Sequence, residues 1–137
     1  MADDLFKAMS ISAAGMKAQG TRLRVISENV ANADSLPQDS NQLPYQRKVV
    51  TFKNELDRRA GVDTVRIDKI TTDKSEFNKQ FDPNHPAADE NGYVLTPNVN
   101  TLIEMMDMRE AQRSYEANLS VIKASRSMLQ STIDVLR

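Results

Sequence analysis

The chain has 137 residues, with 39% hydrophobic and 27% charged side chains and a formal net charge of −1, which suits one domain with a modest core or a small domain carried on long helices. Its 18 basic and 19 acidic residues form no long run of either sign, so the surface lacks the positive field of a nucleic-acid or anionic-membrane binder. The absence of cysteine excludes disulfides, thiolate nucleophiles and cysteine-ligated metals.

The N-terminal segment predicts a long helix over residues 5–31. Apolar residues recur there at alternating intervals of four and three, the heptad spacing of a helix that packs against another helix. At about 1.5 Å per residue the helix is about 40 Å long, and Asp3 or Asp4 is placed to cap its start. The predicted seam consists of Leu5, Met9, Ser12, Met16, Gln19, Leu23, Ile26 and Val30.

The middle of the chain predicts a small β-rich segment. All five prolines lie between residues 37 and 97, which leaves both ends of the chain free of the strongest helix breaker. Five of the seven aromatic residues also lie in this segment, so we expect it to have a small core of its own. The predicted strands cover residues 45–52, 62–70, 76–83 and 93–95, with a tight turn at Asn91-Gly92 before the last.

The C-terminal segment predicts a second long helix over residues 98–136, again with heptad spacing. Counted from its sequence, this helix outruns the first by about three turns, since each turn takes about 3.6 residues. The excess would leave an apolar strip without a partner inside the chain. The seam consists of Met105, Met108, Gln112, Tyr115, Leu119, Ile122, Arg126, Leu129, Ile133 and Leu136.

These elements predict an α+β fold in which long N- and C-terminal helices form a coiled-coil-like domain with a small β-rich inserted domain. The predicted division is 1–36 for the first helical part, 37–94 for the insert and 95–137 for the second helical part. No stretch approaches the length of about 20 apolar residues that a membrane-spanning helix needs.

Catalytic or metal chemistry finds little support in the sequence. The only histidine, His85, lies in a proline-rich stretch that favours an ordered turn over a calcium loop. The carboxylates Glu104 and Asp107 are interpreted as a solvated helix face. Gly15 and Gly20 follow no strand, so they do not form a phosphate-binding loop. We therefore expect no enzymatic activity, no cofactor and no metal.

Two asparagines, Asn29 and Asn32, close the first predicted helix just before Leu36-Pro37 forbids its continuation. Asparagine tolerates the left-handed conformation and bonds free carbonyls, so an ordinary helix end is one interpretation.

The methionines indicate how the helices pack. Apart from Met1, every methionine lies in a predicted terminal helix, where an adaptable side chain suits several different neighbours. A simple intramolecular hairpin is the alternative, but the excess apolar length of the second helix favours packing between molecules.

Three stretches resemble a known family. The stretch ISAAGMKAQGTRLRVISENVANADS (residues 11–35) is similar to the signature of the bacterial flagellar rod and hook proteins. The stretches DPNHPAADENGYVLTPNVN (82–100) and EMMDMREAQRSYEANLSVIKASRSM (104–128) are similar to the proximal-rod type in particular.

This resemblance implies a structural subunit of the hollow, torque-transmitting axial rod, located in the periplasmic part of the basal body. It also implies export by the flagellar type III apparatus, which agrees with the N-terminal sequence: MADDLFKAMSISAAGM has no basic start followed by the apolar core of a cleaved secretory signal. The implied partners are other copies of the chain, homologous rod proteins, the export apparatus and basal-body ring components, with no nucleic acid and no direct membrane span. The implied assembly interface is Leu5, Met9, Met16, Leu23, Ile26, Asn29, Val30, Asn32, Met105, Met108, Tyr115, Asn118, Leu119, Ile122, Leu129, Ile133 and Leu136. The resemblance adds a second role for the amides of Asn29 and Asn32, which is to form hydrogen bonds between subunits as well as to end the helix.

The alternative function is that of a soluble cytoplasmic binding module, a helical hairpin with a β insert that holds one partner.

Overall fold

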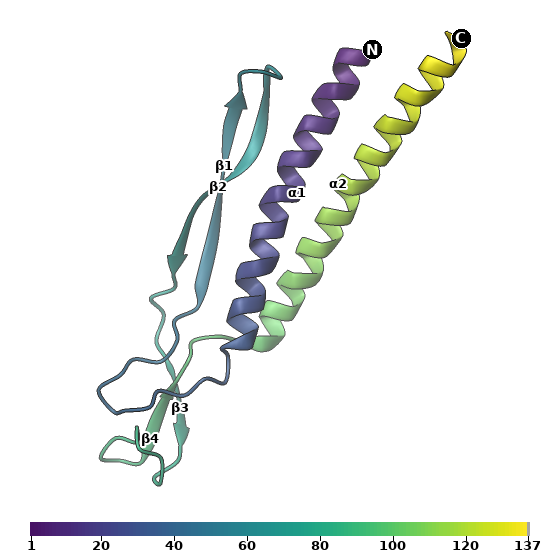
Figure 1. The fold of residues 1–137 in the computed structure, drawn as a ribbon. Coiled ribbons are helices and arrows are strands. Elements are labelled where there is room, and N and C mark those ends of the chain that lie inside the picture. The colour runs from purple at the N-terminus through teal and green to yellow at the C-terminus, as the bar shows by residue number, and fades with distance from the viewer. Residues whose placement is uncertain (137) are drawn as a thin grey trace. The chain divides into compact units, whose positions relative to one another are not determined.

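The computed structural model describes residues 1–136 and has long helices at both ends with four strands between them (Figure 1). This arrangement confirms the predicted α+β class. The element bounds are α1 Ala2–Ala31, β1 Lys48–Asp57, β2 Val62–Thr72, β3 Asn78–Phe81, β4 Tyr93–Thr96 and α2 Thr101–Val135.

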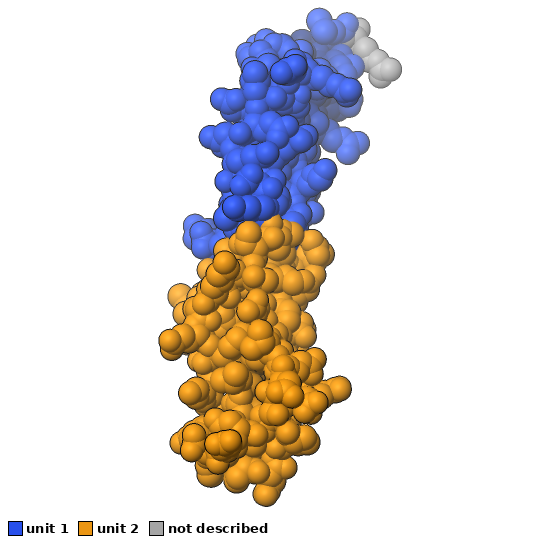
Figure 2. Space-filling view, turned by 90° about the vertical axis from the view of Figure 1, so that its left-hand side faces the viewer, with its two compact units in different colours: residues 1–23, 50–69, 109–137 blue, residues 24–49, 70–108 orange. Residues whose placement is uncertain are grey.

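The chain forms two compact units, coloured separately in Figure 2. Unit 1 comprises residues 1–23, 50–69 and 109–137, and unit 2 comprises residues 24–49 and 70–108. Each unit therefore contains a section of both helices and a section of the segment between them, whereas the predicted division at 36/37 and 94/95 follows the order of the chain.

Three of the aromatic residues on which the expected core of the insert was argued are not buried. Phe52, Phe81 and Tyr93 are exposed large side chains. The buried apolar residues of unit 2 come from both helix and insert, since Val25 and Ile26 of α1 are buried as well as Val94 of β4. Unit 2 therefore has buried apolar residues in both the helix and the insert.

Helix α1 starts earlier than predicted, at Ala2, so Asp3 and Asp4 lie in its first turn instead of capping it. Their negative charges there stabilise the positive end of the helix dipole. The Asp3 carboxylate also lies 2.7 Å from the Lys7 ammonium one turn later. This hydrogen bond lowers the pKa of Asp3.

Helix α2 starts at Thr101, three residues later than predicted, because Asn100 caps it. The Asn100 side-chain oxygen accepts hydrogen bonds from the backbone N–H groups of Leu102 and Ile103, at 3.1 and 3.3 Å. These groups are among the free donors that every helix start leaves.

The predicted excess of three turns at the end of α2 is wrong. In unit 1, a Cβ built on Gly15 would lie 2.9 Å from the side-chain nitrogen of Asn118, so these residues face each other. Because the helices are antiparallel, the thirteen residues from Gly15 back to Ala2 lie beside the thirteen residues from Asn118 on to Ser131. Only about one turn of α2 then extends past the start of α1.

The strands form two separate two-stranded sheets. Strands β1 and β2 form a hairpin whose loop contains Gly61 at a φ of +66°. Strands β3 and β4 are antiparallel, with a register that runs from Asn78 opposite Thr96 to Phe81 opposite Tyr93. The rings of this last pair meet edge to face, with centroids 5.3 Å apart.

The predicted turn at Asn91-Gly92 is confirmed. The Gly92 N–H donates to the carbonyl of Asp89 at 3.0 Å, and Gly92 has a φ of +81° that favours glycine. The stretch around His85 also forms ordered turns, in which the His85 Nδ1 accepts from the Ala87 N–H at 3.1 Å.

Across residues 1–136, none of the helices is both long enough and apolar enough to cross a membrane.

Candidate assembly surface

A buried polar network in unit 2 joins the end of α1 to the insert and to the start of α2. Its centre is Asn29, whose side chain is 1% exposed. The Asn29 amide nitrogen donates to the Lys48 carbonyl at 2.9 Å and to Glu104 Oε2 at 3.0 Å. The Asn29 amide oxygen accepts from the Tyr45 hydroxyl at 2.8 Å and from the Lys48 N–H at 2.9 Å.

These four hydrogen bonds use both donors and both acceptor positions of the Asn29 amide. No capacity remains for a bond to another subunit, so Asn29 acts inside the chain. Asn32 bonds a carbonyl at the helix end, but not a free one: its side-chain nitrogen donates at 2.8 Å to the Glu28 carbonyl, which also accepts from the Asn32 backbone N–H at 3.1 Å. It does so without the left-handed conformation, since only glycines among the described residues have a positive φ.

The interpretation of Glu104 and Asp107 as a solvated helix face is wrong for Glu104, which is 1% exposed. Its carboxylate accepts hydrogen bonds from Asn29 and from the Arg47 Nε. The same guanidinium lies 3.6 Å from Asp73 and 3.8 Å from Asp107. A buried carboxylate is stable only when it is paired and hydrogen-bonded in this way.

Asn98 connects the backbone of Arg47 with the segment after β2. Its side-chain oxygen accepts from the Arg47 N–H at 2.8 Å, and its side-chain nitrogen donates to the Asp73 carbonyl at 3.1 Å and to Ser75 Oγ at 2.9 Å. Hydrogen bonds from the Ser75 N–H and hydroxyl lower the pKa of Asp73.

The edge of the network carries an ion pair between Glu28 and Lys48, at 2.7 Å. The Lys48 ammonium donates to the Glu28 carboxylate, which lowers the pKa of Glu28 and raises that of Lys48. Burial raises the pKa of the Tyr45 hydroxyl, which keeps it a donor to Asn29.

In unit 1, α1 and α2 are antiparallel and meet through small side chains. Gly15 faces Asn118, while Arg22, seven residues after Gly15, lies 3.6 Å from Glu110. Ala111 and Ser125, seven residues on either side of Asn118, are buried. We call Gly15 with Ala111, Asn118 and Ser125 the contact row. Small residues let the two helix backbones approach closely.

The large apolar residues of the predicted seams lie beside the contact row, on one side of it. Met16 follows Gly15, and Leu119 follows Asn118. One residue turns a right-handed helix by about 100°. The two helices face each other and run in opposite directions. A step of one residue therefore places Met16 of α1 and Leu119 of α2 on the same side of the helix pair.

Six partly exposed side chains share this side of unit 1, and we call them the open face: Met9, Met16, Leu23, Tyr115, Leu119 and Ile122. The β1–β2 hairpin lies against the other side of α1, where Ala14, Ala18 and Thr21 line a hollow with Thr64 and Ile67 of β2. Within unit 1, six residues of the predicted seams therefore lie together on a side of the helix pair away from the hairpin.

The remaining predicted interface residues are distributed differently. Leu5, Val30, Asn32, Met108 and Leu129 are partly exposed, like the residues of the open face. Met105, Ile133 and Leu136 are exposed. Ile26 and Asn29 are buried in unit 2, and Asn118 belongs to the contact row in unit 1.

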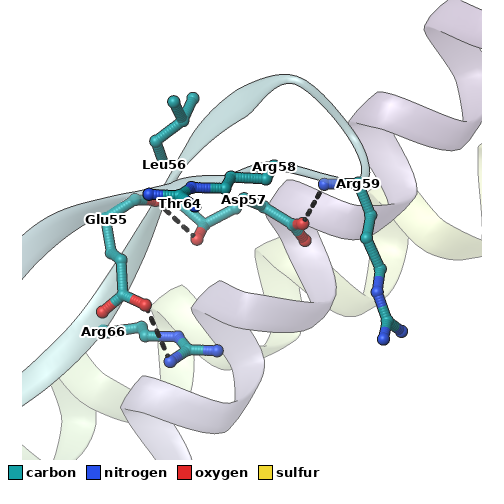
Figure 3. Close-up of a pocket in the computed structure, with 7 residues that line it drawn as sticks. All are labelled: Glu55, Leu56, Asp57, Arg58, Arg59, Thr64 and Arg66. Atoms are coloured by element: carbon teal, nitrogen blue, oxygen red, sulfur yellow. Dashed lines mark hydrogen bonds and ion pairs between the residues drawn. The ribbon is translucent and has the colours of Figure 1, made fainter.

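The end of the β1–β2 hairpin has a hollow with charged walls (Figure 3). Arg66 lies 3.0 Å from Glu55, and the Asp57 carboxylate accepts from the Arg59 N–H at 2.9 Å. The Glu55 and Asp57 carboxylates are thus engaged by neighbours within the hairpin. Among residues 1–136, no group of three or more His, Cys, Asp and Glu side chains is arranged to hold a metal ion.

The chain is thus an α+β protein whose terminal helices carry partly exposed apolar rows. Comparison with known proteins shows its family. The sequence profile of the flagellar basal body rod FlgEFG protein C-terminal region matches residues 90–135.

Full-length relatives are more specific. The chain is 51% identical to the flagellar basal-body rod protein FlgC of Agrobacterium fabrum over 98% of this chain and 97% of that protein. It is 37% identical to FlgC of Aquifex aeolicus, over 96% of each. It is 33% identical to FlgC of Bacillus subtilis, over 95% of this chain and 97% of that protein. The chain therefore belongs to the FlgC family of flagellar basal-body rod proteins.

Sequence reasoning missed the residues that hold the network together, among them Tyr45, Arg47, Lys48, Asn98 and Glu104. The available signal was Glu104 itself, a carboxylate in the first turn of an otherwise apolar helix start. Its partners Asn29 and Arg47 are 75 and 57 residues away in sequence, so no local pattern connects them.

Proposed function

We propose that this chain is a subunit of the proximal rod that assembles with copies of itself and with homologous rod proteins through its terminal helices. The assembled helices would form a hollow axial structure that transmits torque. The observation that carries the proposal is the open face, because it gathers large apolar side chains from both helices that the chain itself buries only in part. Contiguous apolar surface that stays accessible on one side of a helix pair marks an interaction site.

The physical logic is that of a helical array. Contacts that do not close on themselves extend an assembly indefinitely, and each contact can be moderate because every subunit touches several others. The buried network around Asn29 supports this function indirectly, since it holds the insert firmly on the helices that carry the load.

The proposed function also includes how the chain leaves the cytoplasm and where it is incorporated. We propose that the flagellar type III apparatus exports the chain without a cleaved signal, and that the chain then joins the periplasmic rod and contacts basal-body ring components. The family membership supports this route.

The test is a substitution in the open face, Met16→Lys, with Ala13→Lys as the matched control. Ala13 is an exposed residue on the far side of α1, so both variants add the same charge to the same helix. We expect Met16→Lys to abolish motility and to be missing from purified basal bodies, while Ala13→Lys supports normal motility.

Circular dichroism of both purified variants separates lost assembly from lost folding. Truncation after Ser125 is the second variant and should also prevent assembly, because it removes the outer half of the α2 seam. Normal motility of both variants, with the chain recovered from the cytoplasm, would contradict the proposal and favour the cytoplasmic binding module.

A further inference from the structure

We infer that α2 carries a second docking seam, on the flank opposite the open face, and that its occupant is the open face of a second copy of this chain. This inference rests on the proposed function and adds which two surfaces meet. The seam consists of Ala117, Val121, Ala124, Met128, Ser131 and Val135, all of them exposed.

The position of this seam follows from the contact row. Ala117 and Ala124 immediately precede Asn118 and Ser125, whereas Leu119 of the open face immediately follows Asn118. The residue before a contact-row position and the residue after it are rotated about the helix axis by about 100° in opposite directions. The two apolar surfaces therefore lie on opposite flanks of α2 in unit 1.

The composition of the flank is that of a helix-packing seam. Its six residues are spaced alternately four and three, and none is charged, although charged residues occupy other positions of the same stretch, such as Lys123 and Arg126. Val121 is 43% exposed, Met128 57% and Val135 86%. A solvated helix face would carry charges at such positions, so this pattern indicates a surface that is covered in the assembled state.

The open face of another copy fits this seam by size and by spacing. Ala117, Ala124 and Ser131 are small and recur every seven residues. Met9, Met16 and Leu23 of the open face are large and also recur every seven residues. Both rows repeat about every 10.5 Å along their helices, so each large side chain can enter the space above a small one, as knobs enter holes.

A contact between two different faces has a further consequence. An open face that paired only with itself would form a closed dimer, whereas an open face that docks on the opposite flank of the next copy leaves a free surface at each end. The second seam therefore supplies what an extending array needs.

The absence of cysteine allows a direct test by cross-linking. Two variants with different tags, Ala124→Cys and Met16→Cys, are expressed together in flagellated cells that lack the unmodified chain, and the assembled rods are oxidised. We expect a disulfide-linked dimer that carries both tags, because paired cysteines must bring their Cα atoms to within about 7 Å.

The matched control is Lys123→Cys with Met16→Cys, since Lys123 is exposed and adjacent in sequence to Ala124 but lies on another face. The mixed dimer should be at least tenfold more abundant with Ala124→Cys. Equal yields, or dimers formed only between two Met16→Cys chains, would overturn the inference.

A functional readout separates this inference from the proposed function. If Met16→Lys abolishes assembly but Ala124→Lys does not, the rod function stands and the second seam is rejected. If neither substitution affects assembly, the proposed function itself fails.

Discussion

Asn29 shows at the scale of a single residue how one amide can organise a fold. It connects α1 with residues 16, 19 and 75 positions away. Each partner would lose a hydrogen bond if the amide were removed, and Glu104 is a buried carboxylate that then keeps only Arg47. Unsatisfied buried groups cost more than an average hydrogen bond contributes.

We therefore expect Asn29→Ala to lower the free energy of unfolding by about 3 kcal/mol, since a buried polar group without its partner costs about 1–3 kcal/mol. Asn32→Ala is the control, because Asn32 is only partly buried and its side chain makes one hydrogen bond to Glu28; its loss should stay below about 1 kcal/mol. Urea unfolding followed by circular dichroism measures both values. Equal losses would show that the network does not hold unit 2 together.

The helices show at the scale of an element what sequence patterns can and cannot predict. Heptad spacing placed α1 and α2 to within three residues of their observed bounds at every end, because apolar periodicity is a local property. It did not reveal that the helices meet through Gly15, Ala111, Asn118 and Ser125. A search for large apolar residues passes over such small ones, although they set how closely two backbones approach.

The two helical glycines of α1 allow a sharp comparison. A Cβ added at Gly20 would meet nothing within 4 Å, whereas one added at Gly15 would lie 2.9 Å from Asn118. Alanine is favoured over glycine inside a helix by about 1 kcal/mol. We expect Gly20→Ala to raise the midpoint of thermal unfolding and Gly15→Ala to lower it, because the new methyl group at residue 15 displaces the Asn118 side chain from its hydrogen bond to the Ser114 carbonyl, at 2.9 Å.

Circular dichroism during heating measures both midpoints. A rise in both would show that helix propensity alone decides, and that the contact row is not closely packed.

At the scale of the whole molecule, the balance of charge favours association. The formal net charge is only −1, so copies of the chain repel one another weakly. The open face and the second seam are largely apolar, and apolar association is not screened by ions. We expect raising the salt concentration from about 0.05 M to about 0.5 M, which shortens the Debye length several-fold, to leave self-association unchanged or stronger.

Sedimentation of the purified chain at both salt concentrations measures this effect. Dissociation at high salt would indicate that ion pairs hold the copies together, and would contradict an interface built on the two apolar surfaces.

The separation of Asn29 from Glu104 along the chain also bears on the order of folding. Contacts between distant residues form only after the intervening chain is available, and they slow folding. A chain that emerges from a narrow passage with its N-terminus first can begin α1 at once, but it cannot complete the network until residue 104 has also emerged. In such a chain, the hydrogen-bond network of unit 2 therefore forms late, after most of the residues have emerged.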